Sequence, residues 1–134
     1  MVKITKDMKE MIIRVRTAAV ATATKDGKPN VVAIAFTKVI SENEILLMDN
    51  YMNKTRANIE DNPVVAISVW DLEDRMGYQF KGKARIETTG IIFEEGTQWV
   101  KSKRPQVNPK AAIIVKVDEI YLIGSGNNSG KRIA

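Results

Sequence analysis

The sequence predicts a mainly β protein, a small antiparallel barrel built on one domain of 134 residues. Three observations predict this class. Segments rich in Val, Ile and Phe recur between turns, two successive connections have hairpin character, and residues 77–87 alternate apolar with polar side chains. Closing such strands into a barrel removes exposed strand edges. Since no linker, repeat or low-complexity segment divides the chain, we expect a single domain over residues 1–134.

The first half of the chain predicts a helix followed by strands. Apolar residues recur at helical spacing up to Val15, after Thr5, which can cap the helix. The pair Asp26-Gly27 is a strong hairpin signal between two strand-like segments. The strands expected in this half are residues 18–24, 29–40 and 45–49.

The second half predicts two further helices and three further strands. One helix stops before Asn62-Pro63 and the other before Pro105, because proline cannot continue a helix. The expected helices are residues 54–61 and 89–103, and the expected strands are residues 64–70, 77–87 and 111–123. Trp70 is expected in the core at a strand end. The glycine- and asparagine-rich tail from Gly124 is expected to be mobile, with folding over a ligand as the alternative.

The composition excludes several kinds of chemistry. The chain contains neither Cys nor His, so disulfides, thiolate zinc sites, Cys nucleophiles and Ser-His-Asp triads are ruled out. No metal site is expected. If the protein carries out a reaction, a bound cofactor is expected to supply the reactive group.

The formal net charge of +5 leaves two interpretations of the surface. A solvated basic surface is favoured over a nucleic-acid patch. In residues 77–87 the aromatic Tyr78 and Phe80 fall on the face opposite Lys81 and Lys83, which is not the pattern of a base-stacking platform. No signal-peptide core or membrane-spanning stretch is evident, so a cytoplasmic protein is expected.

The segment from Asp49 to Asn58 joins a strand end to a helix start. The first N–H groups of a helix lack backbone partners and carry partial positive charge, which together favour anion binding. Lys54 adds a full charge there and Thr55 a hydroxyl, while Asn58 projects from the same helix face. The alternative is that Asn53 only caps the helix, Lys54 is solvated and Asn58 is a polar surface residue.

An ordered set of short motifs resembles the FMN-binding split-barrel superfamily that includes pyridoxamine 5′-phosphate oxidase. The motifs are Asn50-Tyr51, Lys54-Thr55, Asn62-Pro63, Trp70 and Gly82-Lys83-Ala84. The stretch from Ala18 to Phe36 also resembles the short, stand-alone members. The resemblance implies a six-stranded antiparallel split β-barrel with short flanking helices, forming a homodimer with FMN in a cleft between the subunits.

The same resemblance implies a set of cofactor-binding residues. Lys54 and Thr55 would bind the FMN phosphate, and a strand backbone would run along the flavin ring. For Trp99, packing is favoured over a lid on the flavin. The full set is Ala33, Ile34, Ala35, Met48, Asp49, Asn50, Asn53, Lys54, Thr55, Asn58, Gln79 and Trp99.

Two departures from the family pattern bear on function. The phosphate site has Lys followed by Thr where the family usually has Arg followed by Lys, so Arg56 could assist. No C-terminal segment supplies substrate-binding Trp and Arg or His, so pyridoxamine phosphate oxidation is not expected. The expected function is an FMN-dependent oxidoreductase or electron carrier, with its enzymatic nature and partner left open. The alternatives are a module of this fold for a deazaflavin or haem, and a nucleic-acid-binding barrel.

Overall fold

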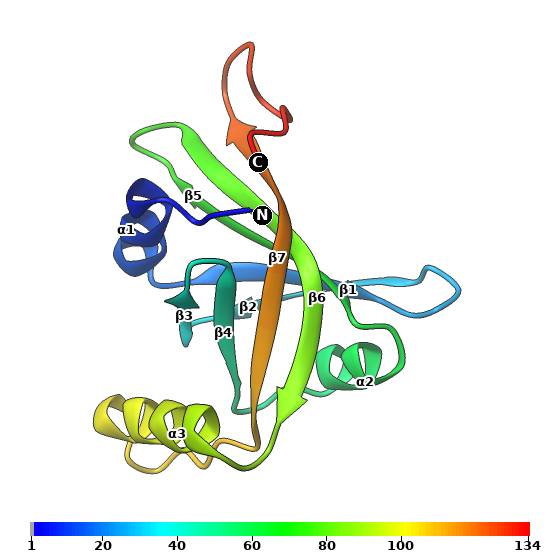
Figure 1. Ribbon diagram of the computed structural model, residues 1–134, viewed down its shortest axis with the longest axis vertical. Coiled ribbons are helices and arrows are strands. Elements are labelled where there is room, and N and C mark those ends of the chain that lie inside the picture. Colours follow the sequence, from blue (N-terminus) through cyan, green and yellow to red (C-terminus); the bar gives the residue numbers. More distant parts are fainter. Residues whose placement is uncertain (1) are drawn as a thin grey trace.

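Over residues 2–134, the computed structural model contains one antiparallel sheet of seven strands and three helices (Figure 1). The strand order is β2-β1-β5-β6-β7-β4-β3. The strands are β1 (Ala18–Ala23), β2 (Pro29–Ile34), β3 (Thr37–Ser41), β4 (Glu44–Asp49), β5 (Val64–Asp71), β6 (Met76–Glu87) and β7 (Ala111–Gly124). The helices are α1 (Lys6–Val15), α2 (Lys54–Asp61) and α3 (Ile91–Lys103).

The mainly β antiparallel fold is confirmed, with seven strands rather than six. The extra strand arises because the segment expected as one long strand breaks at Ala35 and Phe36, between β2 and β3. The Thr37 N–H donates to the Ala35 carbonyl at 3.0 Å, and the Thr37 hydroxyl donates to the Ile34 carbonyl at 3.0 Å. Since β2 pairs with β1 and β3 pairs with β4, this turn carries the chain from one end of the strand order to the other.

The main core lies inside the barrel and under α1. The alternation expected in β6 is confirmed, because Phe80 is buried while Lys81 and Lys83 are exposed. Helix α1 begins with the expected Thr5 cap, which forms a capping box with Met8. The side chains buried in this core include Met11, Ile12, Val20, Ile67 and Ile113.

A second apolar cluster fixes α3 against the outer side of β4. It contains Leu46 and Met48 from β4, together with Val100 from α3. Close approach depends on Gly96, where an added Cβ would lie 2.5 Å from the Met48 sulfur. The helix therefore supports the strand that leads into the β4–α2 connection.

One expectation about the surface was wrong. Trp70 is 47 % exposed rather than part of the core, because Val65, Ile67 and Val69 take the inward positions of β5. The tail after Gly124, which the sequence analysis expects to be mobile, forms an exposed loop and then turns back along β7, where Tyr121 forms a bridge with Arg132.

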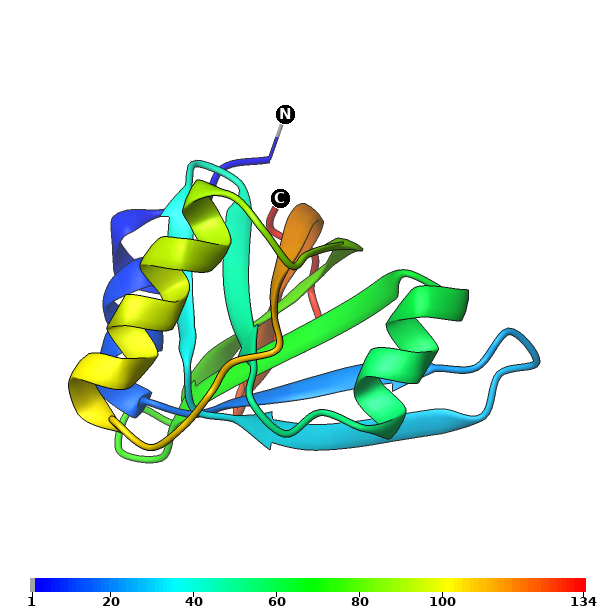
Figure 2. The same ribbon diagram turned by 90° about the horizontal axis from the view of Figure 1, so that it is seen from below.

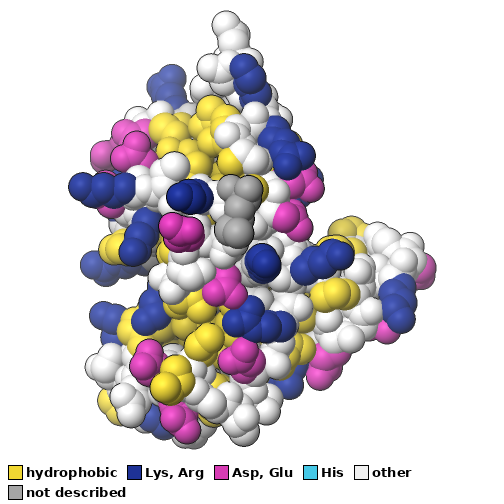
Figure 3. Space-filling view, viewed as in Figure 1, with side chains coloured by type: hydrophobic (Ala, Val, Ile, Leu, Met, Phe, Trp, Pro, Cys, Tyr) yellow, Lys and Arg dark blue, Asp and Glu magenta, His cyan; other side chains and the backbone are white. Residues whose placement is uncertain are grey.

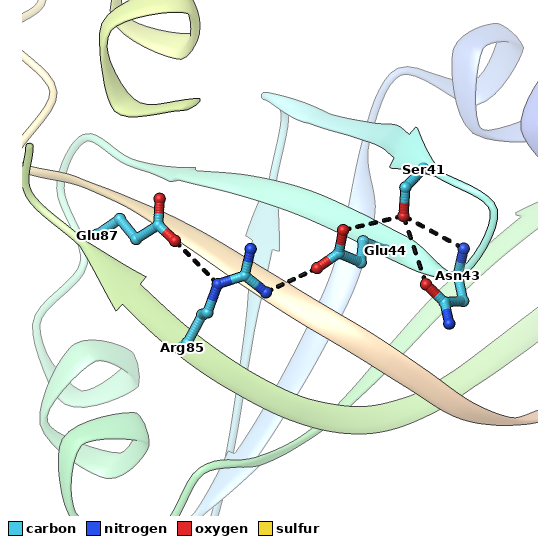
Figure 4. Close-up of polar contacts among 5 residues, drawn as sticks. All are labelled: Ser41, Asn43, Glu44, Arg85 and Glu87. Atoms are coloured by element: carbon cyan, nitrogen blue, oxygen red, sulfur yellow. Dashed lines mark hydrogen bonds and ion pairs between the residues drawn. The ribbon is translucent and has the colours of Figure 1, made fainter. Parts of the chain in front are cut away.

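A polar cluster joins β4 to β6 across the intervening strand β7 (Figure 4). Arg85 on β6 donates to Glu44 on β4 at 2.7 Å and to Glu87 at 2.9 Å. Glu44 also accepts a hydrogen bond from the Ser41 hydroxyl at 3.0 Å. Hydrogen bonding by Arg85, more than that by Ser41, holds the pKa of Glu44 below its usual value of 4.5.

The surface in Figure 3 is charged but mixed in sign. Lys and Arg side chains alternate with Asp and Glu over this face rather than gathering into one basic patch. Such intermixing fits the solvated basic surface favoured by the sequence. Among residues 2–134, no helix has the length and hydropathy that crossing a bilayer would require.

Candidate functional site

A cavity of about 610 Å³ lies where β2, the β4–α2 connection and the α3–β7 connection meet. Figure 2 shows the β4–α2 connection running alongside β2, with the chain after α3 beside it. The residues lining the cavity are Asn30, Val32, Ala33, Ile34, Ala35, Phe36, Met48, Asn50, Tyr51, Met52, Asn53, Lys54, Thr55, Arg104, Gln106 and Val107. A cavity of this size is in the range of small-molecule sites.

Most of the expected cofactor-binding residues come together in this cavity. They are Ala33, Ile34, Ala35, Met48, Asn50, Asn53, Lys54 and Thr55. Residues 32–35 are consecutive, and successive side chains of a strand point to opposite faces. A cavity that contacts all four must therefore run along the backbone edge of β2, which has no neighbouring strand on that side.

The N-terminus of α2 opens into one end of the cavity. The side chain of Asn53 makes no capping hydrogen bond within the described residues, contrary to the alternative that it only caps the helix. The Lys54 side chain is exposed, and Thr55 beside it is 2 % exposed. Uncapped first-turn N–H groups, an ammonium and a hydroxyl thus meet at one point, which is suited to an anion.

Asp49 lies beneath the cavity and outside its lining. Its carboxylate is fully buried and accepts from the Met52 N–H at 2.9 Å and from Arg56 Nη1 at 2.8 Å. Lys110 approaches the same carboxylate at 3.8 Å and donates to the Met52 carbonyl at 2.9 Å. Asp49 therefore fixes the shape of the β4–α2 connection, and the Arg56 guanidinium is bound to Asp49 rather than aimed at the anion site.

A buried amide and hydroxyl network lies behind α2. Asn58 is outside the cavity lining, only 9 % exposed, and donates to the Thr22 hydroxyl at 3.0 Å. Asn30 donates to the same Thr22 oxygen at 3.2 Å and to the Thr55 hydroxyl oxygen at 3.0 Å. Asn58 is thus neither a surface residue nor part of the cavity wall, and it acts on the site through Thr22 and Asn30.

The two remaining expected residues also lie outside the cavity lining. Gln79 sits in the middle of β6, opposite Ser68 on β5 and Tyr121 on β7. The Trp99 ring meets Phe36 edge-on, with centroids 5.2 Å apart and planes at 85°. Since Phe36 lines the cavity, Trp99 supports its wall by packing, in agreement with the favoured interpretation of this residue.

The connection from α3 to β7 closes the cavity at its other end, a position that the sequence did not predict. Arg104, Gln106 and Val107 contribute from this connection. Val107 belongs to the same apolar cluster as Phe36. The distance from Asn30 to Ala35 along β2 is roughly 16 Å at strand rise. Lys54 borders the cavity beside Thr55, which Asn30 contacts. Arg104 borders it from the connection whose Val107 clusters with Phe36. The two cations therefore lie toward opposite ends of the cavity.

Within the described part of the chain, one buried polar atom of the cavity wall lacks a protein partner. Among residues 2–134, the buried Oδ1 atom of Asn50 has no hydrogen-bond partner. A buried acceptor left unpaired costs about 1–3 kcal/mol. The atom is thus suited to accept a hydrogen bond from a hydroxyl or N–H group of a molecule in the cavity.

The fold, with its open sheet edge beside the uncapped start of α2, is that of the FMN-binding split barrels. The chain belongs to the pyridoxamine 5′-phosphate oxidase family, whose family model matches residues 4–124. It is 38 % identical, over 99 % of its length and 89 % of the relative's, to an uncharacterized protein of Methanocaldococcus jannaschii. It is 34 % identical to HupZ of Group A Streptococcus, with a TM-score of 0.82 over 95 % of this chain and 99 % of that one.

Solved structures of this fold differ in the cofactors that their names state. An FMN-binding protein from Syntrophomonas wolfei superposes with a TM-score of 0.79 at 14 % identity, covering 90 % of this chain and 86 % of that one. HutZ, the haem storage protein of Vibrio cholerae, superposes with a TM-score of 0.66 at 18 % identity, covering 92 % and 96 %. At these identities the similarity shows the fold alone.

Proposed function

We propose that this protein binds FMN in the cavity and acts as an oxidoreductase or electron carrier. The observation that supports this proposal most strongly is that one cavity combines an uncapped helix start, Lys54 and Thr55 with the open backbone edge of β2. Lys54 and Thr55 would hold the phosphate, and the backbone of residues 33–35 would offer hydrogen bonds to the ring. When bound, FMN supplies hydride and single-electron transfer.

The remaining residues of the site bind and orient rather than donate protons. Asn50 Oδ1 would accept from a ligand hydroxyl or N–H group, and Met48 would give the cavity an apolar wall. Because the chain has no His or Cys, protons consumed in the reaction would come from solvent or from the substrate.

A homodimer is part of this proposal. The outward face of β2, β1 and β5 carries the exposed Val31, Val64 and Trp70, at 65 %, 45 % and 47 % exposure. A shallow groove on this face shares Val32 and Ala33 with the cavity. A second copy covering this apolar face would therefore also border the ligand. Val31→Glu should shift the protein from dimer to monomer in sedimentation velocity, with Glu95→Lys as the surface control.

The experiment is a binding titration of the purified protein with FMN, followed by flavin fluorescence and absorption. Wild type should bind FMN, and Lys54→Ala should bind it about 10–100-fold more weakly, since hydrogen bonds to charged groups contribute about 1.5–3 kcal/mol. Lys28→Ala is the matched control, because Lys28 is an exposed lysine of the β1–β2 turn outside the cavity. Equal FMN affinity of wild type, Lys54→Ala and Lys28→Ala would contradict the assignment of Lys54 to the phosphate site.

Competition separates FMN from the other cofactors of this fold. An anion site at α2 does not by itself distinguish FMN from a phosphorylated deazaflavin, so both are titrated together with haemin. Preference for FMN supports the proposal. Preference for the deazaflavin or for haemin overturns the FMN assignment.

A further inference from the structure

Thr55 is the most buried of the polar residues that line the cavity. Thr55 lines the cavity but is only 2 % exposed. Its oxygen accepts a hydrogen bond from Asn30 Nδ2 at 3.0 Å. Among residues 2–134, no acceptor is found for its hydroxyl proton.

The network behind Thr55 determines which way this proton points. Asn30 Nδ2 carries two hydrogens, and the structure directs them to Thr55 and Thr22 at 3.0 and 3.2 Å. The Thr22 oxygen also accepts from Asn58 Nδ2 at 3.0 Å, so two amide donors converge on it. Both hydroxyl oxygens therefore serve as acceptors toward the protein interior. A hydroxyl that accepts on its inner side has its proton left for the opposite side.

From this geometry we infer that Asn30 is a positioning residue that makes the Thr55 hydroxyl a donor into the cavity. The inference rests on the proposed function and deepens it, because the donated bond would go to the phosphate of FMN. The Lys54 ammonium is a point charge on a flexible side chain, whereas a hydroxyl held in one orientation donates its hydrogen bond in a fixed direction. The pair would then favour the phosphorylated flavin over riboflavin, which lacks the phosphate.

The Asn30→Asp variant tests the direction of the hydrogen bond. The new carboxylate has the same shape but can only accept, so it would draw the Thr55 proton inward and leave an oxygen facing the phosphate. Because Asn30 lines the cavity, the added negative charge would also repel the phosphate, and the uncharged Asn30→Ala variant below separates the two effects. We expect FMN to bind at least tenfold more weakly and riboflavin to change by less than twofold. Asn62→Asp is the matched control, since Asn62 follows α2 and donates to the Ala23 and Thr24 carbonyls outside the cavity. It should leave the ratio of FMN to riboflavin affinity unchanged.

A double-mutant cycle tests whether Asn30 acts through Thr55. Thr55→Val removes the hydroxyl, and Asn30→Ala removes the donor behind it without adding charge. If the inference is correct, Asn30→Ala weakens FMN binding in the wild-type background but has little further effect in Thr55→Val. Thr55→Ser keeps the hydroxyl and should retain the wild-type FMN-to-riboflavin ratio. Each variant's urea midpoint is measured, and only folded protein is titrated.

The outcomes separate this inference from the proposed function. Wild type that binds FMN, with Asn30→Asp binding it equally well or losing FMN and riboflavin alike, overturns the role of Asn30 and leaves the FMN site standing. Additive losses in the cycle also overturn it. A wild-type protein that binds neither flavin overturns both.

Discussion

Two stretches of strand edge, one on β7 and one on β2, differ in whether the chain itself covers them. Beyond Lys116, where pairing with β4 ends, β7 is covered by the chain's own tail. Ile120 and Leu122 donate to the Ala134 and Lys131 carbonyls at 3.1 and 2.9 Å. The outer edge of β2 has no such cover, and residues 32–35 instead line the cavity.

One stretch of strand edge is thus covered by the chain itself, and the other is left open at the candidate site. Natural proteins protect strand edges, because an open edge invites pairing with other chains. The closed stretch of β7 follows that rule. The open stretch of β2 lies beside the uncapped start of α2. Under the proposed function, its free backbone groups would be covered by a ligand, a second copy or both.

The largest effect on the free energy of unfolding is expected from Asp49→Ala, next to the cavity at the open edge of β2. The substitution leaves Arg56 and Lys110 without the buried carboxylate and frees the Met52 N–H. Breaking a buried ion pair typically costs about 3–5 kcal/mol. Urea unfolding should show a loss of this size, while Asp74→Ala, which removes an exposed partner of Arg14, should cost at most about 1 kcal/mol. Similar losses in both variants would contradict the anchoring role of Asp49.

Removal of residues 131–134, which cover the edge of β7, should lower the stability of the protein. The deletion removes the hydrogen bonds that the tail makes with Ile120 and Leu122. The loss of four backbone hydrogen bonds at about 0.5–1 kcal/mol each should lower the free energy of unfolding by roughly 2–4 kcal/mol. FMN affinity of the folded protein should remain within about twofold. A loss of affinity in folded protein would show that the two edges are not independent.

A smaller effect is expected behind the cavity wall, from Gly96→Ala. The added methyl group would lie 2.5 Å from the Met48 sulfur, so Met48 must shift, and it lines the cavity. Overpacking of this kind costs about 1–3 kcal/mol. Thermal unfolding and FMN titration should both register the change, whereas Glu95→Ala, on an exposed position of the same helix, should change neither. Unchanged stability in Gly96→Ala would mean that α3 can move away from β4 freely.

The smallest effect is expected from Arg85→Gln, within the paired part of the sheet. Arg85 is about half exposed, so its interaction with Glu44 should stabilise the protein by only about 0.5 kcal/mol. Because Arg85 lowers the pKa of Glu44, this stability is present above the usual value of 4.5 and is lost as the pH falls through the lowered pKa. Urea unfolding at neutral pH and at successively lower pH should therefore show the difference between wild type and variant closing in acid. A difference that grows in acid would contradict the assignment.

The sequence predicted those elements that carry local signals. Asp26-Gly27 marked the β1–β2 turn, Thr5 marked the start of α1, and Asn62-Pro63 marked the end of α2. The break between β2 and β3 was missed because Ala35 and Phe36 include neither glycine nor proline. The segment is interrupted because the chain must cross from β2, at one end of the strand order, to β3 at the other end.

The site was predictable where it lies on one continuous segment and not where distant segments meet. Lys54 and Thr55 stand at a helix start that the sequence marks, and both line the cavity. Arg104 reaches the cavity only through the packing of α3 on β4, which no local pattern encodes. The roles of Asp49 and Asn30 likewise depend on partners that tertiary folding brings together, such as Lys110 and Thr55.

The turn at Ala35 and Phe36 has a practical consequence. It joins the two terminal strands of the sheet at the wall of the cavity, so an occupant would contact both ends of the strand order and two connecting segments at once. A molecule that binds only the native state at a hundred times its Kd adds about 2.7 kcal/mol to stability. For a chain of this length that corresponds to a rise in Tm of roughly 10 °C. Melting curves across a library of phosphorylated metabolites would therefore rank candidate ligands without any assay of turnover.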